Sequence, residues 1–261
     1  MMRYAKRWNQ MEKQYHIGLS SHDGAKYALL PGDPGRVLDI AEFLEDPMFV
    51  CSNREFTTYA GKLLGQRVLV TSTGIGGPSA SIALEELYRV GVRTCIRIGT
   101  CGAIQKEILG GDLIIPNGSV RMEGTSKEYA PIEFPAVPDF TVTSALVEAA
   151  KKLQKKYHVG VIQSKDSFYG QHNPEKMPVS YELLNKWEAW IRLGCLGSDM
   201  ESAALFIAGS TLRMRIGCVL KVVWNQEREK IGLDNPHCMS TKSAIETGVY
   251  ALKSLIMQEN E

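Results

Sequence analysis

Short runs of apolar, largely β-branched residues alternate along this chain with longer amphipathic stretches. The short runs have the length of buried strands, and the longer stretches carry apolar residues at three- and four-residue spacing, as helices do. This alternation predicts an α/β protein built around a largely buried sheet. The predicted strands are 27–30, 67–72, 94–98, 112–115, 159–163 and 216–223, and the clearest predicted helices are 79–90, 144–157, 182–193, 202–213 and 241–257.

The chain contains no linker rich in glycine, serine or proline. We therefore expect a single domain over residues 15–261, preceded by a polar N-terminal arm over residues 1–14. Residues 121–139 include three prolines, which predict a long irregular segment. Loops of that length are often functional, although a plain surface connection explains them equally well.

The charges nearly cancel, with 30 Lys and Arg against 29 Asp and Glu and a formal net charge of +1. Such a balance creates no long-range field for nucleic acid or an anionic membrane, so we expect neither as a partner. No stretch approaches the roughly 18 consecutive apolar residues of a membrane span, and residues 1–8 lack the apolar core of a signal peptide. The six cysteines form no CxxC pair or zinc-ligand cluster, which is typical of a reduced, cytoplasmic protein.

The first candidate site is PGDPGRV at residues 31–37, which joins a predicted strand to a predicted helix. Backbone N–H groups at such a turn point outward, Gly32 lets an anion approach closely, and Arg36 adds a fixed charge. These features predict an anion pocket, with Pro34 in the first turn of the helix. A tight turn with a surface arginine is an equally simple alternative.

A second glycine turn, STGIGGPS at residues 72–79, departs from the dinucleotide fingerprint GxGxxG and gives a Rossmann fold little support. The next predicted strand contains Arg97, and a glycine turn with Thr100 follows it. An arginine within a buried strand is costly unless it meets an anion or a carboxylate. Because ligands bind at the carboxyl ends of strands in open α/β sheets, we favour an anion over a structural salt bridge.

Two carboxylates stand close together in SDMESAAL, residues 198–205. Ser198 and Glu201 have the spacing of a capping box, so an ordinary helix start is one interpretation. If the chain is extended there, Asp199 and Glu201 lie on one side of it, and such a pair can receive sugar hydroxyls.

Residues 164–173, SKDSFYGQHN, follow another predicted strand. The aromatic pair Phe168 and Tyr169 can stack on a flat ring, and Gln171 can hydrogen-bond its edge. Core aromatic side chains beside a polar loop are the commoner explanation. None of the five histidines, His172 included, lies in a metal-binding or triad-like pattern.

Together and in order, these segments resemble the uridine phosphorylase branch of the nucleoside phosphorylase superfamily. The resemblance runs from about residue 15 to the C-terminal helix and includes SNREFTTY at 52–59, RIGTCGAI at 97–104 and APIEFPAV at 130–137. It implies a single-domain α/β/α sandwich around a central mixed sheet. The activity it implies is phosphorolysis of a ribonucleoside, uridine or a related pyrimidine nucleoside, to free base and ribose 1-phosphate.

The resemblance also implies roles for individual residues. The phosphate would be bound by Gly32, Arg36, Arg54, Arg97 and Thr100, with Arg54 supplied by a neighbouring subunit. The ribose would be bound by His16, Met200 and Glu201, with His16 reaching a neighbour's site, and the base by Phe168, Gln171 and Asn173. The residues expected to be catalytic are Arg97, Thr100 and Glu201.

The implied reaction needs no organic cofactor, because inorganic phosphate is itself the nucleophile. The resemblance allows a monovalent cation such as K+ near Glu55, Ile75 and Ser79. It also implies a homo-oligomer built from dimers, a homohexamer, with active sites shared between subunits. The corresponding place in metabolism is pyrimidine salvage.

The base-binding loop departs from the uridine phosphorylase pattern. Asn173 stands where an arginine normally follows the base-binding glutamine by two residues, and the loop lacks one residue between Tyr169 and Gly170. We therefore expect weak discrimination for uridine or a preference for another nucleoside, with Arg228 as a substitute for the missing arginine. A milder departure is Asp199, where a glutamate is common.

Other interpretations stay open. Purine nucleoside phosphorylases and nucleosidases of the same superfamily use an aspartate at the end of the late strand, where this chain has Trp224 and Asn225. An asparagine can donate a hydrogen bond but cannot act as a general acid. A catalytically silent protein that binds nucleosides or serves a structural role is the rival from a different class.

Overall fold

A computed structural model of the chain describes residues 13–260 and the side chains of residues 13–259. The N-terminal arm predicted over residues 1–14 therefore lies outside the described residues, apart from Lys13 and Gln14. In the turn that follows, Lys13 pairs with Ser20 across an isolated bridge, and the Gln14 N–H donates to the Leu19 carbonyl at 2.7 Å.

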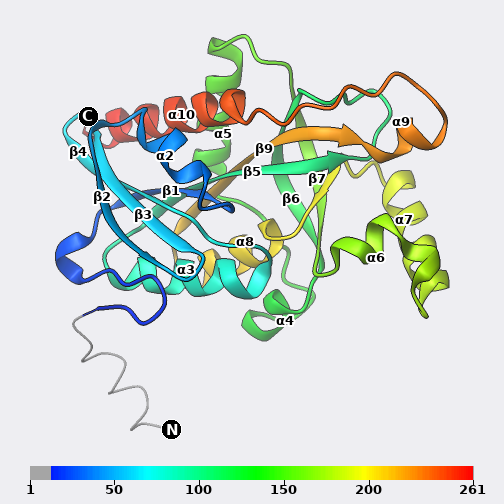
Figure 1. The fold of residues 1–261 in the computed structure, drawn as a ribbon, viewed down its shortest axis with the longest axis horizontal. Coiled ribbons are helices and arrows are strands. Elements are labelled where there is room, and N and C mark those ends of the chain that lie inside the picture. The colour runs from blue at the N-terminus through cyan, green and yellow to red at the C-terminus, as the bar shows by residue number, and fades with distance from the viewer. Residues whose placement is uncertain (1–12, 261) are drawn as a thin grey trace, which may run out of the picture.

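Nine strands within the described residues form one mixed sheet (Figure 1). They are β1 (Tyr27–Pro31), β2 (Glu45–Asn53), β3 (Phe56–Leu63), β4 (Gln66–Thr71), β5 (Thr94–Ala103), β6 (Leu113–Met122), β7 (Tyr157–Lys165), β8 (Gly197–Asp199) and β9 (Arg215–Asn225). The α-helices are α2 (Arg36–Ala41), α3 (Gly77–Arg89), α4 (Thr125–Tyr129), α5 (Phe140–Lys152), α6 (Phe168–His172), α7 (Ser180–Arg192), α8 (Ser202–Thr211), α9 (Gln226–Lys230) and α10 (Lys242–Asn260).

The sheet closes on itself over part of its width. Its strand order is β2-β3-β4-β1-β5-β8-β7-β6-β9, and β9 also pairs with β5. The β5 and β9 strands run parallel, whereas the short β8 is antiparallel to β5 and parallel to β7. Strands β5, β8, β7, β6 and β9 therefore form a closed circuit, from which β1, β4, β3 and β2 extend.

Helices cover both faces of the sheet, with α3, α4 and α8 on one face and α2, α5 and α10 on the other (Figure 1). Alternation along each strand separates two hydrophobic cores. In β1, Ala28 and Leu30 belong to the core beneath α3 and α8, and Tyr27 and Leu29 belong to the core beneath α2, α5 and α10. The fold is an α/β/α sandwich around a central mixed sheet, as the resemblance implied.

All six predicted strands and all five predicted helices are present, with shifted ends. The β5 strand runs past its predicted end at residue 98, so Thr100 lies within the strand rather than in a turn after it. Strands β2, β3 and β8 were not predicted. Of the helices between residues 13 and 260, none has the length and apolar character that crossing a membrane requires.

The prediction of one long irregular segment over residues 121–139 is wrong for its first part. The β6 strand continues through Met122, and α4 follows almost at once. The buried side chain of Arg121 then organises the remaining loop. Its guanidinium donates to four carbonyl oxygens along the segment, those of Ser126, Ala130, Pro131 and Phe134.

Candidate active site

A cavity of about 590 Å³ lies where β1, β4 and β5, which run parallel, reach their carboxyl ends. Its wall combines the two glycine turns, the end of β5, the residues after β8 and the first residues of α6. Ligands of α/β sheets bind in crevices at this edge. The candidates from sequence that line it are Gly32, Arg36, Glu55, Ile75, Arg97, Thr100, Phe168, Gln171, Met200 and Glu201.

Arg97 lies inside β5 with 3% of its surface exposed. Its Nε donates to Asp199 Oδ2 at 3.3 Å, and its Nη2 donates to Glu201 Oε2. Burial alone would lower the pKa of Arg97, but the carboxylates of Glu201 and Asp199 raise it, so the guanidinium stays charged. The salt bridge considered from the sequence is therefore present.

One nitrogen of this guanidinium is left over. Nη1 of Arg97 is buried and has no hydrogen-bond partner among the described residues. It faces the first glycine turn, because a Cβ added to Gly32 would lie 3.9 Å from Nη1 and 3.3 Å from the Gly74 carbonyl oxygen. An unpaired buried donor is costly, and an anion beside Gly32 would satisfy it. Arg97 thus pairs with two carboxylates and still offers a charged donor to the cavity.

Backbone hydrogen bonds hold the two glycine turns against each other. The Thr73 N–H donates to the Pro31 carbonyl at 2.9 Å, and the Gly74 N–H donates to the Gly32 carbonyl at 3.0 Å. Gly74 adopts a φ of 69°, a conformation that side chains other than glycine rarely take. The floor of the cavity is therefore fixed by the backbone rather than by mobile side chains.

The segment 198–205 does not form the capping box that its sequence allows. The α8 helix begins at Ser202, whose N–H donates to Asp199 Oδ2 at 3.1 Å. Glu201 instead accepts from Arg97 and, at 2.7 Å, from the Gly76 N–H. The capping interpretation of Glu201 is wrong, and the expectation that both carboxylates reach the same side is confirmed by their shared contact with Arg97.

The turn after β1 also differs from its prediction. The α2 helix begins at Arg36, so Pro34 precedes the helix instead of lying in its first turn. Asp33 Oδ1 accepts from the Gly35 N–H at 2.8 Å, and Asp33 Oδ2 lies 3.9 Å from Arg36 Nε. Because this carboxylate takes one of the expected backbone donors, the positive charge of the turn resides in the side chain of Arg36.

In another part of the wall, Ser198 and Gln171 contact further uncharged polar side chains, those of Gln163 and Gln226, which lie behind them. Ser198 Oγ lies 2.7 Å from Gln171 Oε1 and 2.5 Å from Gln163 Oε1. Gln171 Nε2 donates to Gln226 Oε1 at 3.0 Å, and the half-exposed ring of Phe168 lies at the mouth of the cavity. An aromatic face beside an amide edge suits a flat heterocycle.

Sequence alone did not single out Lys165, although this residue also lines the cavity. Its Nζ donates to Ser198 Oγ at 2.7 Å and lies 3.4 Å from the Asp199 carbonyl oxygen. Burial lowers the pKa of Lys165 to about 8, and the negative charges of Asp199 and Glu201 oppose that shift. A lysine at the end of an apolar strand was the signal that the sequence offered.

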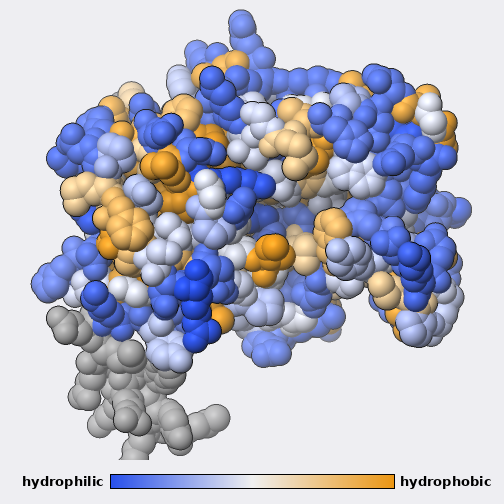
Figure 2. Space-filling model, in the orientation of Figure 1, coloured by the Kyte–Doolittle hydropathy of each residue, from blue (hydrophilic) through white to orange (hydrophobic). Residues whose placement is uncertain are grey.

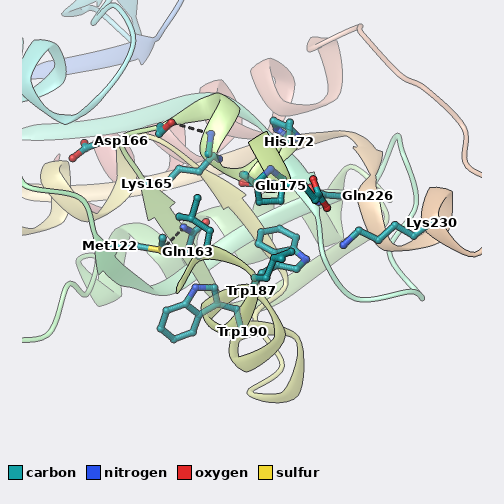
Figure 3. A pocket seen from close by; sticks show the side chains of 16 residues that line it. Met122, Gln163, Lys165, Asp166, His172, Glu175, Trp187, Trp190, Gln226 and Lys230 are labelled. Atoms are coloured by element: carbon teal, nitrogen blue, oxygen red, sulfur yellow. Dashed lines mark hydrogen bonds between the residues drawn. The ribbon is translucent and has the colours of Figure 1, made fainter. Parts of the chain in front are cut away.

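A smaller cavity of about 270 Å³ adjoins the first and shares Lys165, Gln171 and His172 with it. Figure 3 shows the indole rings of Trp187 and Trp190, both from α7, on the opposite side of this smaller cavity from Lys165. Lys165 therefore stands in the partition between a polar cavity and an aromatic one.

Two candidates from sequence lie away from the cavity of their own chain. Arg54 occupies the turn between β2 and β3, and its guanidinium lies 5.6 Å from the centre of the Tyr15 ring. His16 is held by Glu86, whose carboxylate accepts from the His16 N–H at 2.9 Å and lies 2.7 Å from His16 Nδ1. Neither Arg54 nor His16 lines the cavity of its own chain.

The two residues considered for the missing base-binding arginine are also absent from the cavity wall. Asn173 lines neither cavity, and its N–H donates to the Tyr169 carbonyl at 2.9 Å. Arg228 donates through Nε to the Asp234 carbonyl at 2.6 Å and through Nη1 to the Lys106 carbonyl at 2.5 Å. The guanidinium of Arg228 is therefore directed to backbone carbonyls and not to the cavity.

Ile75 and Ser79 belong to the second glycine turn, and the side chain of Glu55 contacts it. Ser79 Oγ lies 2.9 Å from Glu55 Oε1 and 2.6 Å from the Thr73 carbonyl oxygen. Carboxylate, hydroxyl and carbonyl oxygens are the ligands that hard cations take, so the donor set fits a cation such as K+.

The late strand β9 ends in Asn225, which is fully buried. Its Nδ2 donates to the carbonyls of Gln105 and Ile108 at 2.8 and 2.9 Å, and its Oδ1 caps α9 by accepting from two backbone N–H groups. Both ends of this amide are used by the backbone. Trp224, one residue earlier, lines the cavity instead.

Comparison with known proteins agrees with this architecture. The family model described as the phosphorylase superfamily matches residues 26–247. The chain is 52% identical to the uridine phosphorylase of Treponema pallidum (strain Nichols) over 95% of this chain and 96% of that protein. It is 42% identical to the uridine phosphorylase of Escherichia coli (strain K12), over 93% and 98% of the two chains. It is also 40% identical to a guanosine phosphorylase of Halorubrum lacusprofundi, over 82% and 85%. The chain therefore belongs to the phosphorylase superfamily.

Proposed function

We propose that this chain is a nucleoside phosphorylase that cleaves uridine or a related pyrimidine nucleoside with inorganic phosphate, giving the free base and ribose 1-phosphate. The observation that carries the proposal is the unpartnered Nη1 of Arg97, a buried charged donor that faces Gly32. The activities named for the relatives from Treponema pallidum and Escherichia coli support the choice of uridine.

In this mechanism an oxygen of phosphate attacks C1′ of the ribose while the electron pair of the glycosidic bond leaves with the base. A cationic site holds the dianion next to the oxocarbenium-like centre, and this stabilises the transition state without an organic cofactor. Asp199 and Glu201 fix the plane of Arg97, so its free donor is oriented before phosphate arrives. The proposed phosphate ligands are Gly32, Arg36, Arg97 and Thr100, with Arg54 from a neighbouring subunit.

The other substrate groups have separate binding residues in the proposal. Glu201 accepts ribose hydroxyls, Met200 packs on the sugar, and a neighbour's His16 reaches the 5′ end. Phe168 and Gln171 contact the base. Asn173, which lines neither cavity, would have to move to contribute to base binding.

Sites shared between subunits require an oligomer, and we propose a cytoplasmic homohexamer built from dimers. Arg54 and His16 lie outside their own cavity but close to each other in the fold, since Asn53 Nδ2 donates to the His16 carbonyl at 2.7 Å. Figure 2 shows apolar surface near the β2–β3 hairpin and α2, where the exposed residues include Leu38, Phe43, Met48 and Phe49. Exposed apolar surface of this kind supports a subunit contact. K+ bound by Glu55, Ile75 and Ser79 would neutralise a carboxylate in this region.

The test of the activity is the ultraviolet change when the purified chain meets uridine with and without inorganic phosphate. We expect loss of the nucleoside spectrum only when phosphate is present. A panel of uridine, thymidine, cytidine, inosine and adenosine then defines the base. Phosphate-independent cleavage would indicate a nucleosidase, and no cleavage of any nucleoside would favour a silent binding protein.

The test of site sharing is to refold Arg54→Ala together with Glu201→Ala. Each variant alone lacks part of every site, whereas mixed oligomers contain some sites in which both residues are intact. We expect partial recovery of activity. Absence of recovery in oligomers shown to be mixed would contradict a role for Arg54 in the neighbour's site.

A purine nucleoside is the second candidate substrate, because one relative is named a guanosine phosphorylase. Asn225 argues against the purine mechanism in which a late-strand acid protonates the base. This side chain is neutral, fully buried and engaged at both ends of its amide. Uridine therefore remains the substrate that the site favours.

A further inference from the structure

Lys165 differs from the other buried cation of the cavity because no carboxylate pairs with it. It is 5% exposed, and no Asp or Glu oxygen among the described residues lies within 4.0 Å of its Nζ. Buried lysines are rare unless they are paired. The two carboxylates whose charges act on Lys165, those of Asp199 and Glu201, are already directed to Arg97.

The ammonium group of Lys165 also has donor capacity to spare. An ammonium carries three N–H donors and no acceptor. One donates to Ser198 Oγ at 2.7 Å, and a second makes a long contact of 3.4 Å with the Asp199 carbonyl. At least one donor of a buried cation that lines the cavity therefore has no protein acceptor.

Hydrogen bonds connect Lys165 to the region proposed for the base. Ser198 Oγ, which accepts from Lys165, lies 2.7 Å from Gln171 Oε1, and Gln171 Nε2 donates to Gln226. His172, whose pKa is lowered by burial and by the charge of Lys165, lies on the same wall. Lys165 is the one cationic donor in this group of hydrogen-bonded side chains, because Ser198, Gln171 and Gln226 are uncharged.

We infer that Lys165 binds the leaving base, donating a charge-assisted hydrogen bond to a carbonyl oxygen on which negative charge develops as the glycosidic bond breaks. The inference rests on the proposed function and names the residue that supplies the positive charge that neither Asn173 nor Arg228 brings to the cavity wall. The electron pair of the C1′–N bond passes to the base, phosphate oxygen forms the new bond to C1′, and Lys165 keeps its proton throughout. The ligand class is a heterocycle that departs as an anion with an exocyclic oxygen.

The absence of a carboxylate beside Lys165 favours this role in binding the leaving base. A cation that is poorly compensated in the free enzyme gains most when an anion forms beside it, so its interaction is stronger in the transition state than in the ground state. Arg97, which already pairs with two carboxylates, would bind a phosphate that carries its negative charge before the reaction begins. Arg97 thus suits the charge of phosphate, which is present before the reaction, and Lys165 suits the charge on the base, which develops during it.

The kinetic test compares Lys165→Met with wild type on two nucleosides, uridine and 5-nitrouridine, whose nitro group makes the base a far better leaving anion. We expect kcat/KM for uridine to fall on the order of ten- to a hundred-fold, and kcat/KM for 5-nitrouridine to fall much less. KM for phosphate should stay within about twofold, because phosphate is bound elsewhere. Lys230→Met is the matched control, since this lysine is half exposed and lies 2.7 Å from Glu227 Oε1.

An equal fall for both nucleosides would overturn the inference, and so would an unchanged kcat/KM for uridine or a loss confined to the KM for phosphate. If Lys165 had only a structural role, the substitution would lower kcat/KM for uridine and for 5-nitrouridine by the same factor.

A binding measurement keeps the inference testable if Lys165→Met fails to fold or if wild type shows no turnover. Calorimetric titration of wild type with 5-nitrouracil, which is ionised near neutral pH, should give tighter binding than titration with neutral uracil. Equal affinities would overturn the role of Lys165. Absence of phosphorolysis together with preferred binding of the anion would overturn the proposed function and leave the base site standing.

Discussion

The cavity holds two buried cations whose surroundings are opposite in character. Arg97 contacts two carboxylates, which raise its pKa, and it stays charged at every accessible pH. Lys165 contacts a hydroxyl and a carbonyl, and burial lowers its pKa to about 8. The arginine is therefore stabilised before any ligand binds, whereas the lysine is destabilised until one does.

This difference matches two tasks within one reaction. In the proposed reaction, phosphate brings its charge into the cavity, and a prearranged donor on a fixed guanidinium receives it at little reorganisation cost. The charge on the base exists only as the glycosidic bond breaks, so the residue that meets it must favour the transition state over the ground state. The variants below change one side of this comparison at a time.

Replacing Arg97 by alanine should have the largest effect. It removes the donor proposed for phosphate and leaves Asp199 and Glu201 as unpaired buried carboxylates. We expect kcat/KM to fall at least about a thousandfold and the free energy of unfolding to drop by roughly 3–5 kcal/mol. Steady-state phosphorolysis and thermal melting measure the two effects.

Arg36→Ala is the matched control for Arg97→Ala. In wild type the guanidinium of Arg36 lies at the cavity wall, and its Nε is 3.9 Å from Asp33 Oδ2. We expect lost activity with an almost unchanged melting temperature. If Arg97→Ala turned over substrate at nearly the wild-type rate, the assignment of the phosphate site to this end of the cavity would be wrong.

Replacing Glu201 by glutamine should have the next largest effect. The amide oxygen can still accept from the Gly76 N–H, but the charge opposite Arg97 and the charged acceptor for ribose hydroxyls are lost. We expect kcat/KM to fall on the order of a hundredfold while the fold is retained. If melting temperature falls and activity changes little, Glu201 serves to hold the second glycine turn and does not bind substrate.

Replacing Lys165 by methionine should stabilise the folded protein near neutral pH. The pKa of Lys165 is about 8 in the folded chain, against an ordinary value of 10.5 for a lysine in water. Well below pH 8 Lys165 is protonated in both the folded and the unfolded chain, and the cost of burying its charge, roughly 3 kcal/mol, is fully present in wild type. Between pH 8 and 10.5 the unfolded chain binds more protons than the folded one, so wild type gains stability as pH rises.

The measurement is chemical denaturation of wild type and Lys165→Met from pH 7 to 10. The variant should be more stable at pH 7, and the gap should narrow above pH 8. The other titratable groups that act on Lys165, those of Asp199, Glu201 and Cys101, are present in both proteins. A variant less stable than wild type at pH 7 would show that the hydrogen bond to Ser198 outweighs the cost of burial.

The two ends of the cavity also differ in how well sequence predicts them. The phosphate end depends on local geometry: a strand, a glycine turn and an arginine within about ten residues. Gly32, Arg36, Arg97 and Thr100 could therefore be named from sequence, and all line the cavity. The partners of Arg97 were harder to assign, because Ser198 and Glu201 fit a capping box and only the extended backbone at β8 excludes it.

The base end is assembled from residues far apart in sequence. Gln226 and Lys165 reach Gln171 and Ser198 through the packing of β7, β8 and α9. The only local signal for either residue was a lysine at the end of a strand. The same reason explains the missed strands. The β2 strand is largely exposed and contains Pro47, and the three residues of β8 gain their strand character from β5 and β7. The base end of the cavity and the strands β2 and β8 both depend on pairing between distant segments, which local periodicity does not reveal.

The smallest effects should come from the two positions that sequence alone would choose as the readers of the base. Neither Asn173 nor Arg228 lines a cavity, and the guanidinium of Arg228 is used by the carbonyls of Lys106 and Asp234. We expect Arg228→Ala to change kcat/KM for uridine less than about twofold, since it removes no substrate contact. Asn173→Arg should likewise leave the order of preference among uridine, thymidine, cytidine, inosine and adenosine unchanged.

The panel, measured in wild type and in both variants, distinguishes base recognition by Asn173 or Arg228 from base recognition by Lys165. If Asn173→Arg raises uridine preference tenfold or more, the loop between Tyr169 and Pro174 moves to the base during turnover, and Lys165 shares its task with the loop. If Arg228→Ala lowers uridine preference by a similar factor, the contacts with Lys106 and Asp234 must break when substrate binds. An unchanged panel leaves the charge at the base to Lys165, the cation that this wall holds without a carboxylate.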